Sequence, residues 1–166
     1  MADTICCNND HDKTKPEYET VAVKKTGKTC QMCENYSKEN QNKQVAIMCC
    51  EGACLRGEIA RQAANILCHR LVPDKTVRIC LGGAFTKNTG QRNLVRNAQK
   101  LIALEGCFLE CSTRMMQGVL PGLAPKIIIA DTLYDFDRQL FGINEMMDDE
   151  IRSHARTVAD EVIRHL

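Results

Sequence analysis

Short apolar runs alternate with longer amphipathic stretches from Val45 to the end of the chain. Each run is continuous and bounded by polar or turn-forming residues, which is typical of strands that are covered on both faces of a parallel sheet. The runs predict strands at residues 45–49, 76–80, 101–104 and 126–130. Apolar positions at helical spacing predict helices at residues 57–71, 89–100, 108–118 and 148–166.

This alternation predicts an α/β fold. Right-handed crossovers between successive strands lead to a doubly wound, Rossmann-like or flavodoxin-like parallel sheet of four or slightly more strands, with helices on both faces. Residues 1–44 differ in character, because they are rich in Lys, Asn, Thr and Glu and contain few branched aliphatic residues. Such a segment cannot bury a core of its own. We therefore expect a small N-terminal extension over residues 1–44 and one α/β domain over residues 45–166.

The overall charge does not indicate a nucleic-acid or membrane partner. The 166 residues include 22 basic and 21 acidic side chains, which create no general attraction to polyanions. No segment reaches the roughly 18 apolar residues of a membrane span, and the amino terminus lacks the pattern of a secretory leader. We expect a cytoplasmic protein that binds neither nucleic acid nor membrane, and the sequence indicates no particular protein partner.

The chain is rich in cysteine, with eleven residues. A reducing cytosol disfavours structural disulfides, so this number points to metal binding or thiol chemistry. Cys50 follows the first predicted strand, Cys80 ends the second and Cys107 follows the third. Parallel strands end on one edge of a sheet, where open α/β folds build their sites. We therefore expect these thiols to lie near one another.

Cys107 and Cys111 are four residues apart. If the third helix begins near Gly106, both thiols project from one face of its first turn, where the helix dipole favours thiolate. Thiolates from Cys50, Cys80, Cys107 and Cys111 would complete a tetrahedral zinc site. The alternative is that free cysteines pack as small hydrophobic side chains, and we expect this of Cys68 in its apolar helix pattern.

A second hypothesis comes from the stretch that begins at Cys50. A strand, a C-x5-R segment and a helix form the phosphate loop of low-molecular-weight phosphatases and arsenate reductases, and Cys50 and Arg56 have this spacing. Asp131, after the fourth strand, would serve as general acid. If the site binds metal instead, Arg56 is expected to be a solvated residue near the helix start. A third hypothesis is a redox protein whose neighbouring thiols cycle through disulfides.

The N-terminal extension contains a C-x2-C pair, Cys30 and Cys33. This spacing is half of a zinc-knuckle pattern, and Cys6, Cys7 and His11 could supply the remaining ligands. The alternative is a disordered tail with unrelated thiols. We expect the segment to be ordered only where metal or the main domain holds it.

From about Val45 to its end, the chain resembles the DGC-domain family. The family pattern opens with C-S-G-x-S-x-x-G after the first strand, and Cys50, Gly52 and Gly57 match it. Glu51 and Cys54 stand where serines are usual.

The family pattern continues with a cysteine that ends the second strand, matched by Cys80, and with D-G-C-x-x-x-C. Residues 105–111 reproduce this motif except that Glu105 replaces Asp. The resemblance implies a metal site, which we expect to bind zinc, and it implies no particular substrate or reaction. Cys54 adds a fifth thiol, so the resemblance leaves open which four cysteines bind the metal.

Overall fold

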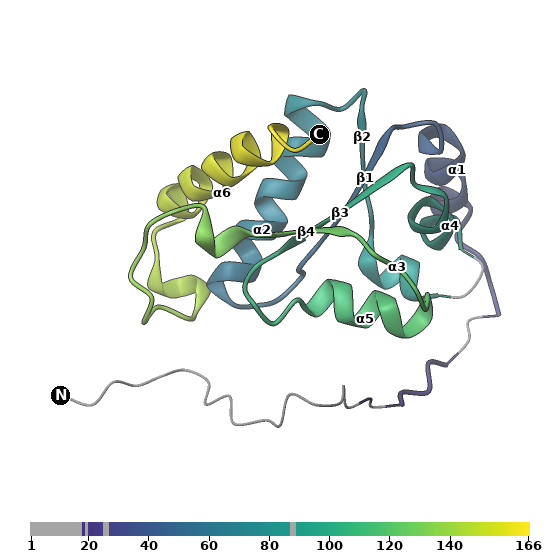
Figure 1. Ribbon diagram of the computed structural model, residues 1–166, viewed down its shortest axis with the longest axis horizontal. Helices are drawn as coiled ribbons and strands as arrows, with labels where there is room; N and C mark the ends of the chain where they lie inside the picture. The colour runs from purple at the N-terminus through teal and green to yellow at the C-terminus, as the bar shows by residue number, and fades with distance from the viewer. Residues whose placement is uncertain (1–17, 19, 25–26, 87–88) are drawn as a thin grey trace.

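The computed structural model describes residues 18, 20–24, 27–86 and 89–166 (Figure 1). Cys6, Cys7 and His11 lie outside the described residues. The strands are β1 (Val45–Cys49), β2 (Thr76–Arg78), β3 (Lys100–Glu105) and β4 (Lys126–Ile129). The helices are α1 (Gln31–Asn40), α2 (Leu55–Ile66), α3 (Leu81–Phe85), α4 (Gly90–Asn97), α5 (Cys111–Val119) and α6 (Asp148–Ile163). A π-helical turn, η1 (Leu67–Leu71), extends α2, and two 3-10 turns are η2 (Ala130–Thr132) and η3 (Ile143–Glu145).

The four strands form one parallel sheet in the order β2-β1-β3-β4. Because β1 has β2 on one side and β3 on the other, the chain leaves β1 in one direction along the sheet and later returns past it. This reversal is the topological switch point of a flavodoxin-like sheet, and ligands of such folds bind beyond the carboxyl ends of the strands on either side of it. The predicted α/β class with parallel strands is confirmed.

Helices cover both faces of the sheet, as β1 illustrates. Val45, Ile47 and Cys49 belong to the core cluster under α2 and α6, whereas Ala46 and Met48 belong to the cluster under α3, α4 and α5. This alternation follows from the two-residue period of a strand. All five residues are buried, which explains why the run is continuously apolar. In Figure 1, α2 and α6 lie on one side of the sheet, and α3, α4 and α5 lie on the other.

Several predicted boundaries near the site are wrong. The second strand ends at Arg78, two residues early, because Cys80 is the N-cap of α3. Helix α3 was not predicted, since five residues with two glycines show no amphipathic period. The fourth strand ends at Ile129, where Ala130 begins a 3-10 turn.

Helix α1 lies in the predicted N-terminal extension and packs against α4. The Ser37 hydroxyl donates to the carbonyl of Gly90 at 2.9 Å, and the Gly90 N–H donates to Glu34 Oε1 at 2.8 Å. A Cβ on Gly90 would lie 2.5 Å from the Ser37 Cβ, so glycine is needed for this close approach. The division at residue 44 stays a prediction.

Within the described parts of the chain, no helix combines the length and apolar character needed to cross a membrane.

Candidate functional site

The loops after β1 and β3 meet backbone to backbone at the switch point. The Cys50 N–H donates to the Leu104 carbonyl at 3.0 Å, which extends the pairing of the two strands by one residue. A Cβ on Gly106 would lie 2.9 Å from the Arg56 carbonyl carbon, and a Cβ on Gly57 would lie 2.8 Å from the Gly52 oxygen. A side chain at Gly106 would push the two loops apart, and one at Gly57 would disrupt the turn of the loop after β1. The glycines of the two motifs therefore bring their cysteines together.

Glu105 caps helix α5 from inside the protein. Its side chain is fully buried and accepts four hydrogen bonds. The N–H groups of Ser112 and Thr113 donate at 3.2 and 2.7 Å, and their hydroxyls donate at 2.5 and 2.7 Å. A carboxylate in this place satisfies the unpaired N–H groups of the first turn and complements the helix dipole. The acidic position of the motif thus anchors the helix that carries Cys111.

The prediction that Cys107 and Cys111 share one face of a helix is wrong. Helix α5 begins at Cys111, and Cys107 lies in the preceding loop. Glu110, the residue before the helix, has a left-handed backbone with φ of 49°, which interrupts any helix that would start earlier. The hydrogen bonds to Glu105 fix the helix start at Cys111.

The Cys50 sulfur lies at the centre of this junction. Its residue is 6% exposed, and the backbone N–H groups of Gly52 and Gly106, one from each loop, hydrogen-bond to it. Burial nevertheless dominates and raises the pKa of the Cys50 thiol, while the charge of Cys111 raises it further. In the absence of a cation the thiol is therefore protonated at neutral pH. Two N–H donors stabilise a thiolate here once a cation offsets the cost of burial.

Three more thiols belong to the same region as Cys50. A Cβ on Gly52 would lie 3.3 Å from the Cys50 sulfur and 3.7 Å from the Cys54 sulfur, so both sulfurs lie next to Gly52. Cys54 is the N-cap of α2. The pKa of Cys107 is raised, first by burial and then by the charges of Asp131, Cys54 and Cys111, while the backbone N–H of Leu109 in the same loop lowers it. Cys50 thus lies near Cys54 and within reach of the charge of Cys111, and Cys107 lies within reach of the charges of Cys54 and Cys111.

Cys80 lies in a different environment from the one predicted. It is exposed at the N-terminus of α3, and its N–H donates to Gln91 Oε1 at 2.9 Å. Its thiol charge raises the pKa of Cys33 on α1. In the described part of the chain, no three or more His, Cys, Asp or Glu side chains are already arranged to hold a metal ion. The predicted ligands therefore divide into a group at the switch point and a group of Cys30, Cys33 and Cys80 next to α1.

Arg56 does not serve as an anion ligand in the loop after β1. Its Nε donates to Asp131 at 3.2 Å, and its two terminal nitrogens donate to the Leu140 and Arg138 carbonyls, each at 2.9 Å. The guanidinium also lies 4.9 Å above the Phe136 ring. The expectation that Arg56 is solvated is wrong, because the segment after β4 folds over the start of α2. These contacts give no support to a phosphatase-like loop built on Cys50 and Arg56.

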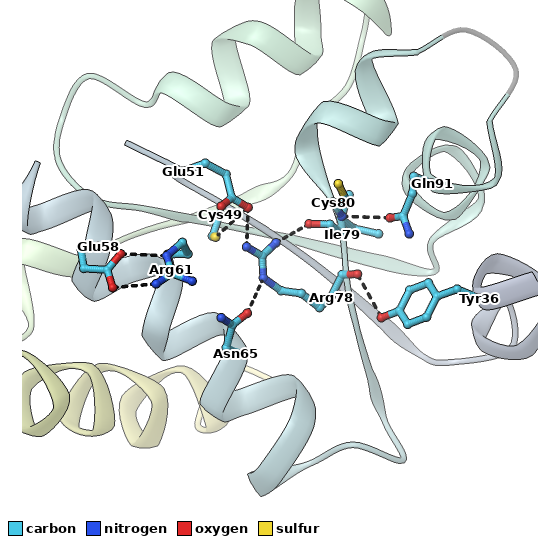
Figure 2. Close-up of polar contacts among 10 residues, drawn as sticks. All are labelled: Tyr36, Cys49, Glu51, Glu58, Arg61, Asn65, Arg78, Ile79, Cys80 and Gln91. Atoms are coloured by element: carbon cyan, nitrogen blue, oxygen red, sulfur yellow. Dashed lines mark hydrogen bonds and ion pairs between the residues drawn. The ribbon is translucent and has the colours of Figure 1, made fainter. Parts of the chain in front are cut away.

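An open cleft of about 460 Å³ lies between α1, α2 and the end of β2. The largely buried Arg78 lines it, and the Arg78 guanidinium donates to Asn65 Oδ1 at 3.2 Å and also contacts Glu51 and the Ile79 carbonyl (Figure 2). On the wall, Arg61 pairs with Glu58 at 2.6 Å. Further lining residues include Met32, Cys33, Tyr36, His69, Cys80 and Gln91. The cleft therefore combines charged, apolar and thiol side chains in its lining.

Two cysteines serve as core residues. Cys49 is fully buried, and burial raises the pKa of its thiol. Cys68 is 3% exposed, and burial raises its pKa to about 11. The expectation that Cys68 packs as a hydrophobic side chain is confirmed. All nine cysteines in the described residues are free thiols.

Sequence reasoning missed Arg78 and the role of Glu105. Arg78 follows two buried residues in a strand of only three residues. A strand this short shows no alternation of apolar and polar residues from which the burial of Arg78 could be predicted. Glu105 was recognised as a motif position, but only the start of α5 reveals its four donors. A carboxylate that ends an apolar strand seven residues before a Ser-Thr pair is the signal that could have indicated a buried cap.

The fold and the junction describe a thiol-rich, doubly wound α/β domain whose motifs meet at a topological switch point. A model of the DGC domain matches residues 46–158, and the chain belongs to this family. Comparison with curated proteins and with solved structures gave no match.

Proposed function

We propose that the protein binds zinc through the thiols at the switch point. One observation carries the proposal: where the loops after β1 and β3 meet, Cys50 lies near Cys54 and within reach of the charge of Cys111, and Cys107 lies within reach of the charges of Cys54 and Cys111. Four thiolates are the donor set that structural zinc prefers, and backbone N–H groups already face two of the sulfurs. When bound, zinc would cross-link the two loops.

The chemistry of the donor set fits the metal, although the side chains must turn to converge on it. Cys111 is exposed and Cys54 is partly exposed, so both have room to change rotamer. The raised pKa values of Cys50 and Cys107 mean that zinc must displace protons from them. Affinity is therefore expected to increase with pH.

The proposed set contains Cys54 in place of Cys80. The family pattern has Ser at position 54 and a cysteine at position 80. In this structure Cys80 lies close enough to Cys33 on α1 for its charge to raise the pKa of Cys33. A site closed by four protein thiolates leaves no position for water or substrate. The role that fits is therefore structural or metal-handling, and the proposal includes no reaction.

The test is the zinc content per chain, measured by mass spectrometry after purification without added metal. We expect a full equivalent in the wild type and in Cys80→Ser, and loss of that equivalent in Cys107→Ser and Cys54→Ser. Retention in Cys54→Ser with loss in Cys80→Ser would replace Cys54 by Cys80 in the ligand set. A wild type that binds no zinc after reconstitution under reducing conditions would refute the proposed function.

A further inference from the structure

A pair of thiols at the start of α1 has no part in the proposed zinc site. Cys30 is the exposed N-cap residue, and Cys33 lies in the first turn and is partly exposed. The Glu34 N–H donates to the Cys30 carbonyl at 3.1 Å, so the helix begins directly after Cys30. Residues three apart are neighbours on a helix, and each of the two thiols affects the pKa of the other. The two thiols are therefore close to each other in the reduced protein.

The two thiols are chemically different. The pKa of Cys30 is lowered, first by the N–H of Cys33, then by the Cys33 side chain and the N–H of Met32. The pKa of Cys33 is raised, first by its hydrogen bond to Cys30 and then by burial and the charges of Cys30 and Cys80. An exposed thiol with a lowered pKa beside a second thiol with a raised pKa is the arrangement of a nucleophile and a resolving cysteine.

Helix α1 holds this pair in a fixed position against the domain. Contacts of Ser37 and Glu34 with Gly90 anchor one side of the helix, and the Tyr36 hydroxyl donates to the Arg78 carbonyl at 3.2 Å (Figure 2). Cys33 lines the cleft of about 460 Å³ above Arg78. A small molecule in the cleft therefore lies beside Cys33, one helical turn from Cys30.

We propose that Cys30 and Cys33 form a redox-active dithiol that reduces the disulfides of low-molecular-weight thiols, with Cys30 as the nucleophile and Cys33 as the resolving thiol. The open cleft beside Cys33 is of a size for such a substrate. The proposal is independent of zinc binding at the switch point, because it uses neither the residues nor the loops of that site.

The reaction proceeds through a mixed disulfide. The Cys30 thiolate attacks one sulfur of the substrate disulfide, the substrate S–S bond breaks, and the departing thiolate takes a proton from solvent. Cys33 then loses its proton to solvent and attacks the Cys30 sulfur, which breaks the mixed disulfide and releases the second thiol. The substrate gains two electrons and two protons, and the protein ends with a Cys30–Cys33 disulfide. A thiol reductant of the cell returns the pair to its reduced form.

Glutathione disulfide serves as the probe in a stoichiometric reaction with reduced full-length protein. Tryptic cleavage after Lys28 and Lys38 gives a peptide of residues 29–38 that contains both cysteines and no others. We expect this peptide to lose two hydrogens without added mass. In Cys33→Ser the same peptide should retain one glutathione on Cys30, and in Cys30→Ser it should be left unmodified. Cys80→Ser is the matched control, because its thiol lies beside Cys33 but has no role in the proposed step.

Three outcomes would overturn the proposal. Equal trapping of glutathione in Cys30→Ser and Cys33→Ser would show two ordinary exposed thiols. Loss of peptide oxidation in Cys80→Ser would mean that Cys33 pairs with Cys80. Protection of Cys30 and Cys33 that ends only when a chelator is added would make the pair metal ligands. Zinc content measured on the same samples shows independently whether the proposed zinc site at the switch point is correct.

Discussion

Replacement of Glu105 tests whether a buried carboxylate positions the metal-binding loop. In Glu105→Ala, the N–H and hydroxyl groups of Ser112 and Thr113 lose their common acceptor in a buried place. Each hydrogen bond to a charged group contributes about 1.5–3 kcal/mol, and an unsatisfied buried donor costs about 1–3 kcal/mol. The four contributions do not add, because the hydroxyls turn to other acceptors and water enters the space of the lost side chain. We expect the free energy of unfolding to fall by about 3–5 kcal/mol.

Conservative variants make this prediction sharper. Glu105→Gln keeps one oxygen but turns an NH₂ group toward the donors, so its loss should be intermediate. Glu105→Asp restores the acid of the family motif on a side chain shorter by one methylene, and we expect a loss of about 1–2 kcal/mol from longer hydrogen bonds. Glu39→Ala, at an exposed position on α1, is the control for removal of a glutamate.

The assay is urea denaturation followed by circular dichroism, with equal m-values as the condition for comparison. Hydrogen exchange of the Ser112 and Thr113 amides provides a local measurement, because both N–H groups donate to Glu105 and lose this protection when α5 frays. A change of less than about 1 kcal/mol in Glu105→Ala, or a change equal to that of Glu39→Ala, would refute the role of Glu105 as a cap.

Three further predictions concern the backbone and the buried thiols. Gly106→Ala should destabilise the protein by about 1–3 kcal/mol in urea denaturation, because its Cβ would lie 2.9 Å from the Arg56 carbonyl oxygen. The control is Gly118→Ala, which should raise stability by up to about 1 kcal/mol because a Cβ there has no neighbour within 4 Å. Equal effects of the two substitutions would contradict the close approach of the loops. Glu110→Gly should raise stability by roughly 0.5–1 kcal/mol, because glycine relieves a left-handed φ of 49°, and a lower urea midpoint would be evidence against strain there. The pKa of Cys68 is raised from 9.0 to about 11, so the contribution of this thiol to the free energy of unfolding is fully present below pH 9 and is lost as the pH increases through about 11. Between pH 8 and 11, the free energy of unfolding should therefore fall less steeply in Cys68→Ala than in the wild type. Parallel curves would show that Cys68 does not titrate in this way.

The sheet could be predicted from the sequence because burial of a strand on both faces requires a continuous apolar run. The runs that begin at Val45, Leu101 and Lys126 predicted β1, β3 and β4 to within one residue at each end. The order of the strands could not be read in this way, since several arrangements bury the same runs. The position of the switch point between β1 and β3 depends on which strands pair.

Helix α1 shows why local pattern was insufficient outside the domain core. Its residues are mostly polar, and only Ser37 is buried. The helix is stabilised by contacts with Gly90, more than fifty residues away in the chain. Because the contacts that stabilise α1 are not local, the sequence of this segment indicated only a tail or a metal-bound module.

The sequence by itself determined that thiols gather at the carboxyl edge of a parallel sheet, because every strand of such a sheet ends on the same side. Only the tertiary structure decided which thiols are neighbours. The left-handed turn at Glu110 removes Cys107 from α5, and helix α3 leaves Cys80 exposed beside α1, where its charge reaches Cys33. Spacing along a chain limits how far apart two side chains can lie, but their direction depends on backbone angles and caps that distant residues such as Glu105 impose.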